Sequence, residues 1–169
     1  MKITPDYLEQ NKQLHATGGY GISGTRWAKT VVNVCDSVAS KDVLDYGCGQ
    51  RTLERDLGWA ITNYDPCIEG LDAPPEPADV VICTDVLEHI EPDCLEDVLD
   101  DLQRVTRRIG FFVIASRPAD KVLPDGRNAH LIQEPKEWWL PRLSRRFRIS
   151  QVKDMTGEFA VIVRPLEPQ

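Results

Sequence analysis

The sequence predicts one α/β domain built on a doubly wound, mostly parallel sheet. Short apolar strands alternate with amphipathic helices along the chain, which is the pattern typical of such sheets. The segment 79–83 (DVVIC) is apolar almost throughout, as a strand buried on both faces requires. The 169 residues, of which 41% are hydrophobic, suit one domain with a substantial core, so we expect a single domain over residues 1–169.

The amino-terminal half is expected to alternate helix and strand twice. The predicted elements span residues 25–39, 42–46, 52–57 and 61–64. Thr52 is an acceptable N-cap for the second helix. Residues 1–24 include a glycine-rich stretch, GGYGISG, and we expect them to form either a lid over a site or a connecting segment.

The carboxyl-terminal half is expected to hold two buried strands, two helices and a final hairpin. These elements are predicted over residues 79–83, 91–108, 111–115, 135–143, 148–153 and 158–163. The helix over 91–108 has acids in its first half and arginines at its end, the order that the helix dipole favours. The terminal hairpin implies one antiparallel strand in the sheet, and residues 165–169 are expected to fray.

A glycine-rich turn follows the first strand in the segment DVLDYGCGQR, residues 42–51. Gly47 and Gly49 lie where such sheets bind their ligands, beyond the carboxyl ends of the strands, and Asp65 ends the second strand. The GxGxxG fingerprint of dinucleotide enzymes fails, because Thr52 stands at the third glycine position. A nucleoside-type ligand without phosphates therefore fits better than a dinucleotide.

Three segments together resemble class I S-adenosylmethionine-dependent methyltransferases, in particular their compact, mostly small-molecule-directed branch. They are DVLDYGCG, the NYD that ends at Asp65, and DVVICTDVLEHIEP over residues 79–92. The resemblance covers residues 25–163. It implies a Rossmann-like methyltransferase fold, S-adenosyl-L-methionine as cofactor, and methyl transfer as the activity.

The resemblance also implies roles for matching residues. Asp45, Gly47 and Gly49 would line the methionine and ribose part of the cofactor, and Asp65 would hold the ribose hydroxyls. Two further contacts are implied: Asp72 with the adenine amino group, and the backbone of Thr84 and Asp85 with the sulfonium side.

The chain departs from the family pattern in two places. Arg51 stands at a glycine-type position, and only thirteen residues separate Asp65 from Asp79. Pro74, Pro75 and Pro77 occupy that gap, so a helix there is implausible. We expect this region between the second and fourth strands of the family to be shortened, with the third strand vestigial or missing and the adenine side of the pocket more open.

Catalysis of methyl transfer needs mainly alignment, and a base only if the acceptor loses a proton. His130 lies after the strand 111–115, where this fold places its substrate loops, and it is the predicted catalytic residue. His15 and Tyr20 belong to the possible lid, whereas His89 is expected to be structural.

A metal site is a weaker hypothesis for the same region. Asp85, Glu88, His89 and His130 are residue types that can hold a divalent metal, and small-RNA 2′-O-methyltransferases use a similar pattern. The DVLEH segment occurs widely in relatives for which no metal is implied. The sequence therefore assigns no metal.

The acceptor is expected to be a small molecule or a nucleotide-like compound. The net charge of −7 disfavours broad electrostatic binding to nucleic acid, although PRLSRRFR over residues 141–148 is locally basic. The alternatives are a nucleic acid or protein acceptor, or a non-catalytic, cofactor-binding partner protein. Five cysteines without a CxxC pair, no secretory signal and no apolar span predict a cytoplasmic protein that does not enter a membrane.

Overall fold

A computed structural model describes residues 1–16 and 21–166. Tyr20 of the predicted lid and most of the predicted frayed tail lie outside the described residues. Within the described part, no helix has both the length and the apolar character that crossing a membrane requires.

Six strands form one mixed sheet in the order β2-β1-β3-β4-β6-β5. Their bounds are β1 Val43–Tyr46, β2 Thr62–Tyr64, β3 Ala78–Thr84, β4 Thr106–Ala115, β5 Phe147–Met155 and β6 Glu158–Pro165. The first four strands in chain order run parallel, with Leu44 opposite both Thr62 and Val81. β6 is antiparallel to β4 and to β5. The predicted fold class is confirmed, including the carboxyl-terminal hairpin.

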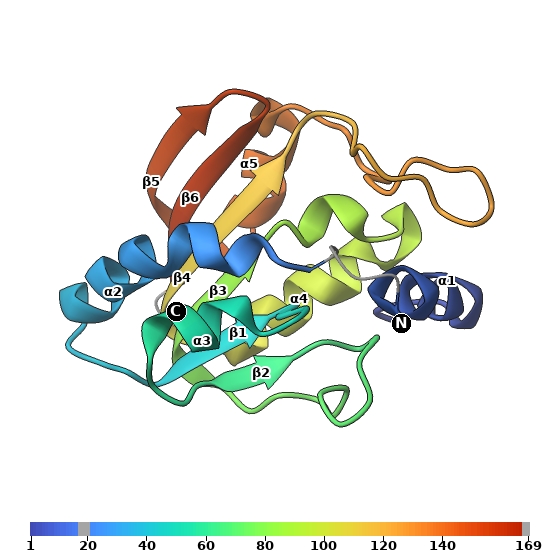
Figure 1. Ribbon diagram of the computed structural model, residues 1–169. Coiled ribbons are helices and arrows are strands. Elements are labelled where there is room, and N and C mark those ends of the chain that lie inside the picture. Colours follow the sequence, from blue (N-terminus) through green and yellow to red (C-terminus); the bar gives the residue numbers. More distant parts are fainter. Residues whose placement is uncertain (17–20, 167–169) are drawn as a thin grey trace.

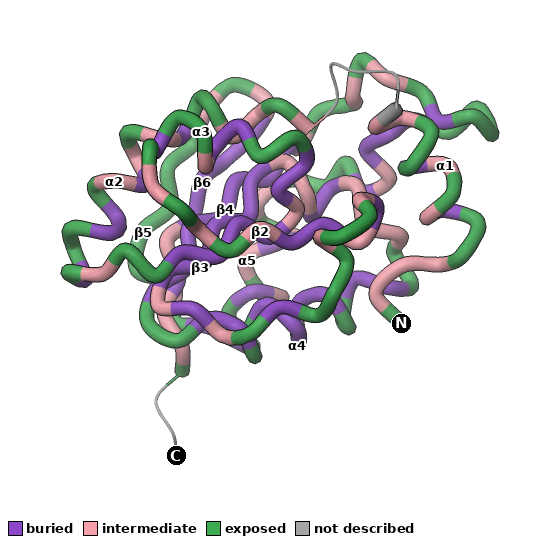
Figure 2. Tube along the Cα trace, turned by 60° about the horizontal axis from the view of Figure 1, so that its bottom comes forward, coloured by how far each residue is buried: buried purple, intermediate pink, exposed green. Residues whose placement is uncertain are grey.

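Helices cover both faces of the sheet (Figure 1). The helices are α1 Pro5–Ala16, η1 Ser23–Trp27, α2 Ala28–Ser37, α3 Thr52–Leu57, η2 Leu87–His89, η3 Pro92–Cys94, α4 Leu95–Val105 and α5 Lys136–Ser144. α2 and α3 pack on one face through a cluster that contains Val31 and Leu53, whereas α4 and α5 pack on the other through a cluster that contains Leu99 and Trp139. The central strands β1 and β3 are almost fully buried between these layers, whereas the edge strand β5 is mostly exposed (Figure 2).

Two local predictions were wrong. Thr52 is the first residue of α3 rather than its cap, and its hydroxyl donates to the carbonyl of Ile22 instead. The helix predicted over 91–108 is the short η3 followed by α4, and Arg107 and Arg108 lie in β4. These arginines pair with aspartates on neighbouring segments, Asp42 and Asp79, rather than with a helix end.

The region between β2 and β3 is shortened, as predicted. None of residues 66–77 forms a helix or a strand, so β2 is an edge strand of only three residues. The wall beside the end of β2 is therefore built from a short loop.

Candidate active site

A pocket of about 350 Å³ lies at the carboxyl ends of β1, β2 and β3. The glycine turn after β1 and the start of the loop after β2 form one wall, and the loops after β3 and β4 form the opposite wall. The amino-terminal helix α1 lies at this end of the sheet (Figure 1) and contributes Tyr7, Asn11 and His15 to the lining. The pocket thus occupies the position at which doubly wound sheets bind their ligands.

The glycine turn depends on backbone conformations that side chains disfavour. Gly47 and Gly49 have φ angles of 82° and 50°. The N–H groups of Gly47 and Cys48 donate to the carbonyl oxygen of Tyr64 at 2.7 and 3.0 Å, which ties the turn to the end of β2. Arg51 also has a positive φ of 58°, so this bulky residue takes the conformation that a glycine would adopt with less strain.

Asp65 connects the turn to the loop after β2. Its Oδ2 accepts a hydrogen bond from the N–H of Gly49 at 3.1 Å, and its Oδ1 accepts one from the N–H of Cys67 at 2.9 Å. His15 of α1 approaches the same carboxylate, with 3.9 Å between Nε2 and Oδ2. Each carboxylate oxygen has two lone pairs, so a side chain held by two donors keeps acceptor sites for hydroxyls of a ligand.

Asp45 is buried in β1 behind the glycine turn. Burial, the negative charge of Asp65 and that of Glu54 together raise the pKa of Asp45 to about 7 from the usual 3.8. The acids at this end of the pocket therefore repel one another. A positively charged ligand nearby would relieve that repulsion.

Because of this pKa, Asp45 is expected to make the protein less stable as the pH rises from about 4 to about 7. In this window the unfolded chain has released the Asp45 proton while the folded chain retains it, so deprotonation opposes folding. Above about pH 7 the loss stays constant, and a shift of about three units corresponds to at most about 4 kcal/mol.

Urea unfolding of wild type and Asp45→Asn between about pH 5 and pH 8 checks this expectation. The variant should gain stability relative to wild type as the pH rises toward about 7, and then keep a constant lead. Asp72→Asn removes one negative charge at an exposed position and controls for net charge. Parallel pH profiles for wild type and Asp45→Asn would contradict the assignment.

The opposite wall carries the imidazoles. His89 lies at the end of η2, and His130 lies on the loop after β4, with ring centroids 4.6 Å apart. Nδ1 of His89 is 2.7 Å from the carbonyl oxygen of Ala129, and Nδ1 of His130 is 2.6 Å from that of Arg117. Burial and the neighbouring His130 lower the pKa of His89 to about 3, so this ring is neutral near pH 7.

The structure brings five of the eight predicted site residues to the pocket surface: Gly47, Gly49, Asp65, Asp85 and His130. Asp45 and Thr84 are buried, and neither is part of the pocket lining. Asp72 is exposed on the loop between β2 and β3, also outside the lining. Its contact with an adenine stays a prediction that the pocket geometry does not support.

The sequence interpretation missed most of the amino-terminal wall. Ile3, Tyr7, Asn11 and His15 all line the pocket, and the last three lie on one face of α1. Their four-residue spacing is a helical signal that was visible in the sequence. Tyr7 links α1 to the wall that carries the imidazoles, because its hydroxyl donates a hydrogen bond to the carbonyl of His89 at 2.6 Å.

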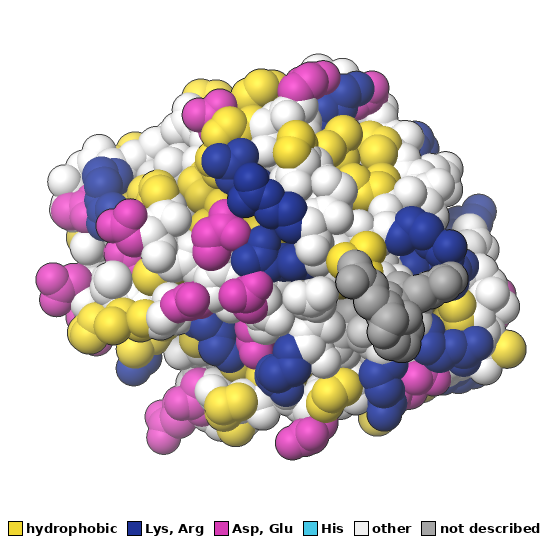
Figure 3. All heavy atoms as spheres, turned by 180° about the vertical axis from the view of Figure 1, so that it is seen from behind, with side chains coloured by type: hydrophobic (Ala, Val, Ile, Leu, Met, Phe, Trp, Pro, Cys, Tyr) yellow, Lys and Arg dark blue, Asp and Glu magenta, His cyan; other side chains and the backbone are white. Residues whose placement is uncertain are grey.

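The basic run over residues 141–148 is only partly available as a surface. Arg146 is buried and forms ion pairs with Glu96 and Asp100 of α4. Arg142 packs over the ring of Trp138, 3.4 Å from its centroid. On the face seen in Figure 3, lysine and arginine side chains lie among acidic ones, and a few basic side chains adjoin one another. The acidic neighbours reduce the positive potential that nucleic-acid binding favours.

The family model of a methyltransferase domain matches residues 24–159. No curated protein sequence matches the chain. Many solved structures share the fold. The DhpI-SAH complex is 19% identical with a TM-score of 0.64, and the alignment covers 98% of this chain and 100% of the other.

Two other solved structures show how widely this fold is used. Burkholderia thailandensis 1,6-didemethyltoxoflavin-N1-methyltransferase with 1,6-didemethyltoxoflavin and S-adenosylhomocysteine is 17% identical, with a TM-score of 0.65 and coverage of 98% and 92%. The 16S rRNA methylase RmtB is 17% identical, with a TM-score of 0.53 and coverage of 98% and 77%. The fold is thus shared by enzymes that act on small molecules and on RNA. From the family match, the chain belongs to the methyltransferase-domain family, and the predicted membership of the methyltransferases and their fold is confirmed.

Proposed function

We propose that the protein transfers the methyl group of S-adenosyl-L-methionine to a small-molecule or nucleotide-like acceptor. The observation that carries this proposal is the pocket itself. It places the Gly47–Gly49 turn and Asp65 on one side and the two imidazoles on the other. When bound, the cofactor supplies an activated methyl group on a sulfonium, so the protein has mainly to hold two ligands in line.

The cofactor side of the pocket fits a cationic nucleoside ligand. Gly47 and Gly49 line the pocket, and the Asp65 carboxylate can accept ribose hydroxyls. A bound cation would also favour the charged form of the buried Asp45, whose pKa is raised to about 7. We assign Asp45, Gly47, Gly49, Asp65 and the backbone at Thr84 and Asp85 to this role.

The acceptor side is supported by the helix α1 at the edge of the pocket. Its buried Tyr7 and Asn11 line the pocket and take up space there, which favours a small acceptor over a polymer. His130 is the proposed catalytic group, because an imidazole that lines the pocket can take a proton from an acceptor. We also propose that residues 1–24 act as the lid over this site. Five free, buried cysteines support a reducing, cytoplasmic environment.

Calorimetric titration with S-adenosylmethionine and with S-adenosylhomocysteine tests the proposal. We expect both to bind one site per chain. Failure of both to bind would remove the proposed function. Binding of both, without turnover of any small-molecule, RNA or protein acceptor in a screen that detects S-adenosylhomocysteine, would favour a non-catalytic binding protein instead.

A further inference from the structure

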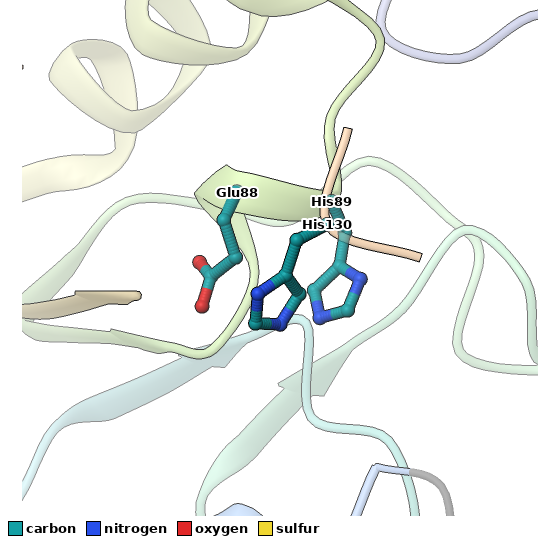
Figure 4. A group of neighbouring side chains, drawn as sticks. All are labelled: Glu88, His89 and His130. Atoms are coloured by element: carbon teal, nitrogen blue, oxygen red, sulfur yellow. The ribbon is translucent and has the colours of Figure 1, made fainter. Parts of the chain in front are cut away.

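The wall of the pocket formed by η2 and the loop after β4 holds a cluster of potential metal ligands. Glu88, His89 and His130 each offer one ligand atom, and these atoms lie within 4.8 Å of one another. Figure 4 shows the two imidazole rings next to each other, with the carboxylate of Glu88 on the side of His130. Two segments far apart in the sequence thus bring together two nitrogen donors and one oxygen donor.

Glu88 is the unusual member of this cluster, because its side chain is fully buried, with 0% exposure. Its Oε1 accepts a hydrogen bond from the N–H of Ala115 at 3.0 Å. Its Oε2 is buried and receives no hydrogen bond from any described residue. A buried carboxylate oxygen that lacks a hydrogen-bond donor is costly, and a proton or a cation beside Oε2 would remove that cost.

Both histidines have the orientation of metal ligands. A carbonyl oxygen can only accept, so Nδ1 of His89 and Nδ1 of His130 donate to the carbonyls of Ala129 and Arg117. In a neutral ring this leaves the lone pair on Nε2. Hydrogen bonds of this kind, from the non-ligating nitrogen to a backbone carbonyl, accompany most histidines that bind metals.

We propose that Glu88, His89 and His130 bind one divalent first-row transition-metal ion. Two imidazoles and one carboxylate suit Zn²⁺, Co²⁺, Fe²⁺ or Mn²⁺ better than Mg²⁺ or Ca²⁺, which prefer all-oxygen sites. Metal–ligand bonds of ~2.1 Å allow ligand atoms at most ~4.2 Å apart, so the cluster contracts by about half an ångström at its widest when the ion binds.

The ion would also define the acceptor of the proposed methyl transfer, and this part of the inference rests on that proposed function. His89 and His130 line the pocket, so the remaining coordination positions face the acceptor. A metal there binds and acidifies a hydroxyl, which makes an alcohol or phenol the acceptor class. The hydroxyl proton passes to solvent, an oxygen lone pair forms the new C–O bond, and the C–S bond breaks with its electrons on sulfur. His130 then acts as a ligand rather than as a base.

Metal titration of the tag-free full-length chain tests the site directly. The d–d absorption of Co²⁺, calorimetry with Zn²⁺, Mn²⁺ and Mg²⁺, and elemental analysis of the purified protein are the readouts. We expect one ion per chain, no comparable binding of Mg²⁺, and a loss of more than about 100-fold in Co²⁺ affinity for Glu88→Gln and for His130→Asn.

His15→Asn is the matched control, since His15 lies in the same pocket but outside the cluster. It should bind Co²⁺ like wild type. If the buried Glu88→Gln variant does not fold, the expected loss of Co²⁺ affinity is tested with His130→Asn alone, because His130 lies on a loop. Absence of binding by wild type would overturn the proposal and leave Glu88 neutralised by a proton, as would unchanged binding by both cluster variants. Titration of the same samples with S-adenosylmethionine separates this outcome from failure of the proposed function, because the Asp65 side of the pocket does not need the ion.

Discussion

Replacing Gly49 by alanine is expected to destabilise the fold and to abolish measurable cofactor binding. Gly49 has a φ of 50°, which costs a residue with a side chain about 1–2 kcal/mol. A Cβ at this position would lie 2.5 Å from the carbonyl oxygen of Gly21 and 2.6 Å from its Cα. Both atoms are backbone, so neither can rotate away. The variant must move the segment around Gly21 off the turn or distort the turn itself.

Gly58→Ala provides the matched control. Gly58 has a φ of 74°, but nothing lies within 4 Å of its Cβ position, so the variant has the conformational cost without the clash. Urea unfolding should show Gly49→Ala losing about 1–3 kcal/mol more than Gly58→Ala, the usual cost of overpacking. Calorimetry should show normal S-adenosylmethionine binding for Gly58→Ala alone. Equal losses of stability would mean that the amino-terminal segment adapts and that the clash argument fails.

The fold was predictable because its signals are local. The apolar run of β3 and the glycine turn can each be recognised within ten residues, and the terminal hairpin within the sixteen residues 148–163. The end of α4 could not be predicted in this way, because Arg107 and Arg108 suit a helix end as well as a strand. Their pairing with Asp42 and Asp79 depends on tertiary contacts that place two segments from earlier in the chain beside β4.

The parts of the site that the backbone positions could be predicted from the sequence, whereas the parts that depend on contacts between distant loops could not. Gly47, Gly49 and Asp65 lie where the motif places them, since a turn after a parallel strand has few alternative geometries. Asp72 did not reach the pocket lining, because the short loop over residues 66–77 does not reproduce the family's longer connection. The proximity of His89 and His130 is a long-range contact between two loops, which the sequence suggested but could not establish.

Asp65→Asn is expected to weaken the binding of S-adenosylmethionine by about 10- to 100-fold, which corresponds to about 1–3 kcal/mol. The wild-type carboxylate accepts from the N–H groups of Gly49 and Cys67. An asparagine can offer its oxygen to only one of them, so its NH₂ group must face the other donor or turn away. The variant therefore loses acceptors for the ligand and also strains the turn, and binding alone does not separate these effects.

A double-mutant-type cycle, in which both the protein and the ligand are altered, separates the loss of ligand contacts from the strain in the turn. Wild type and Asp65→Asn are each titrated with S-adenosylhomocysteine and with its 2′-deoxy and 3′-deoxy analogues. If Asp65 holds the ribose hydroxyls, removing a hydroxyl weakens binding to wild type but costs little further affinity in Asp65→Asn. A purely structural role predicts the same penalty for the deoxy analogues in both proteins. Asp72→Asn serves as the comparison and should change affinity by less than about 2-fold, since one exposed charge contributes little. A larger loss in Asp72→Asn would restore the adenine contact that the sequence resemblance implied, and it would require the loop between β2 and β3 to close over the ligand.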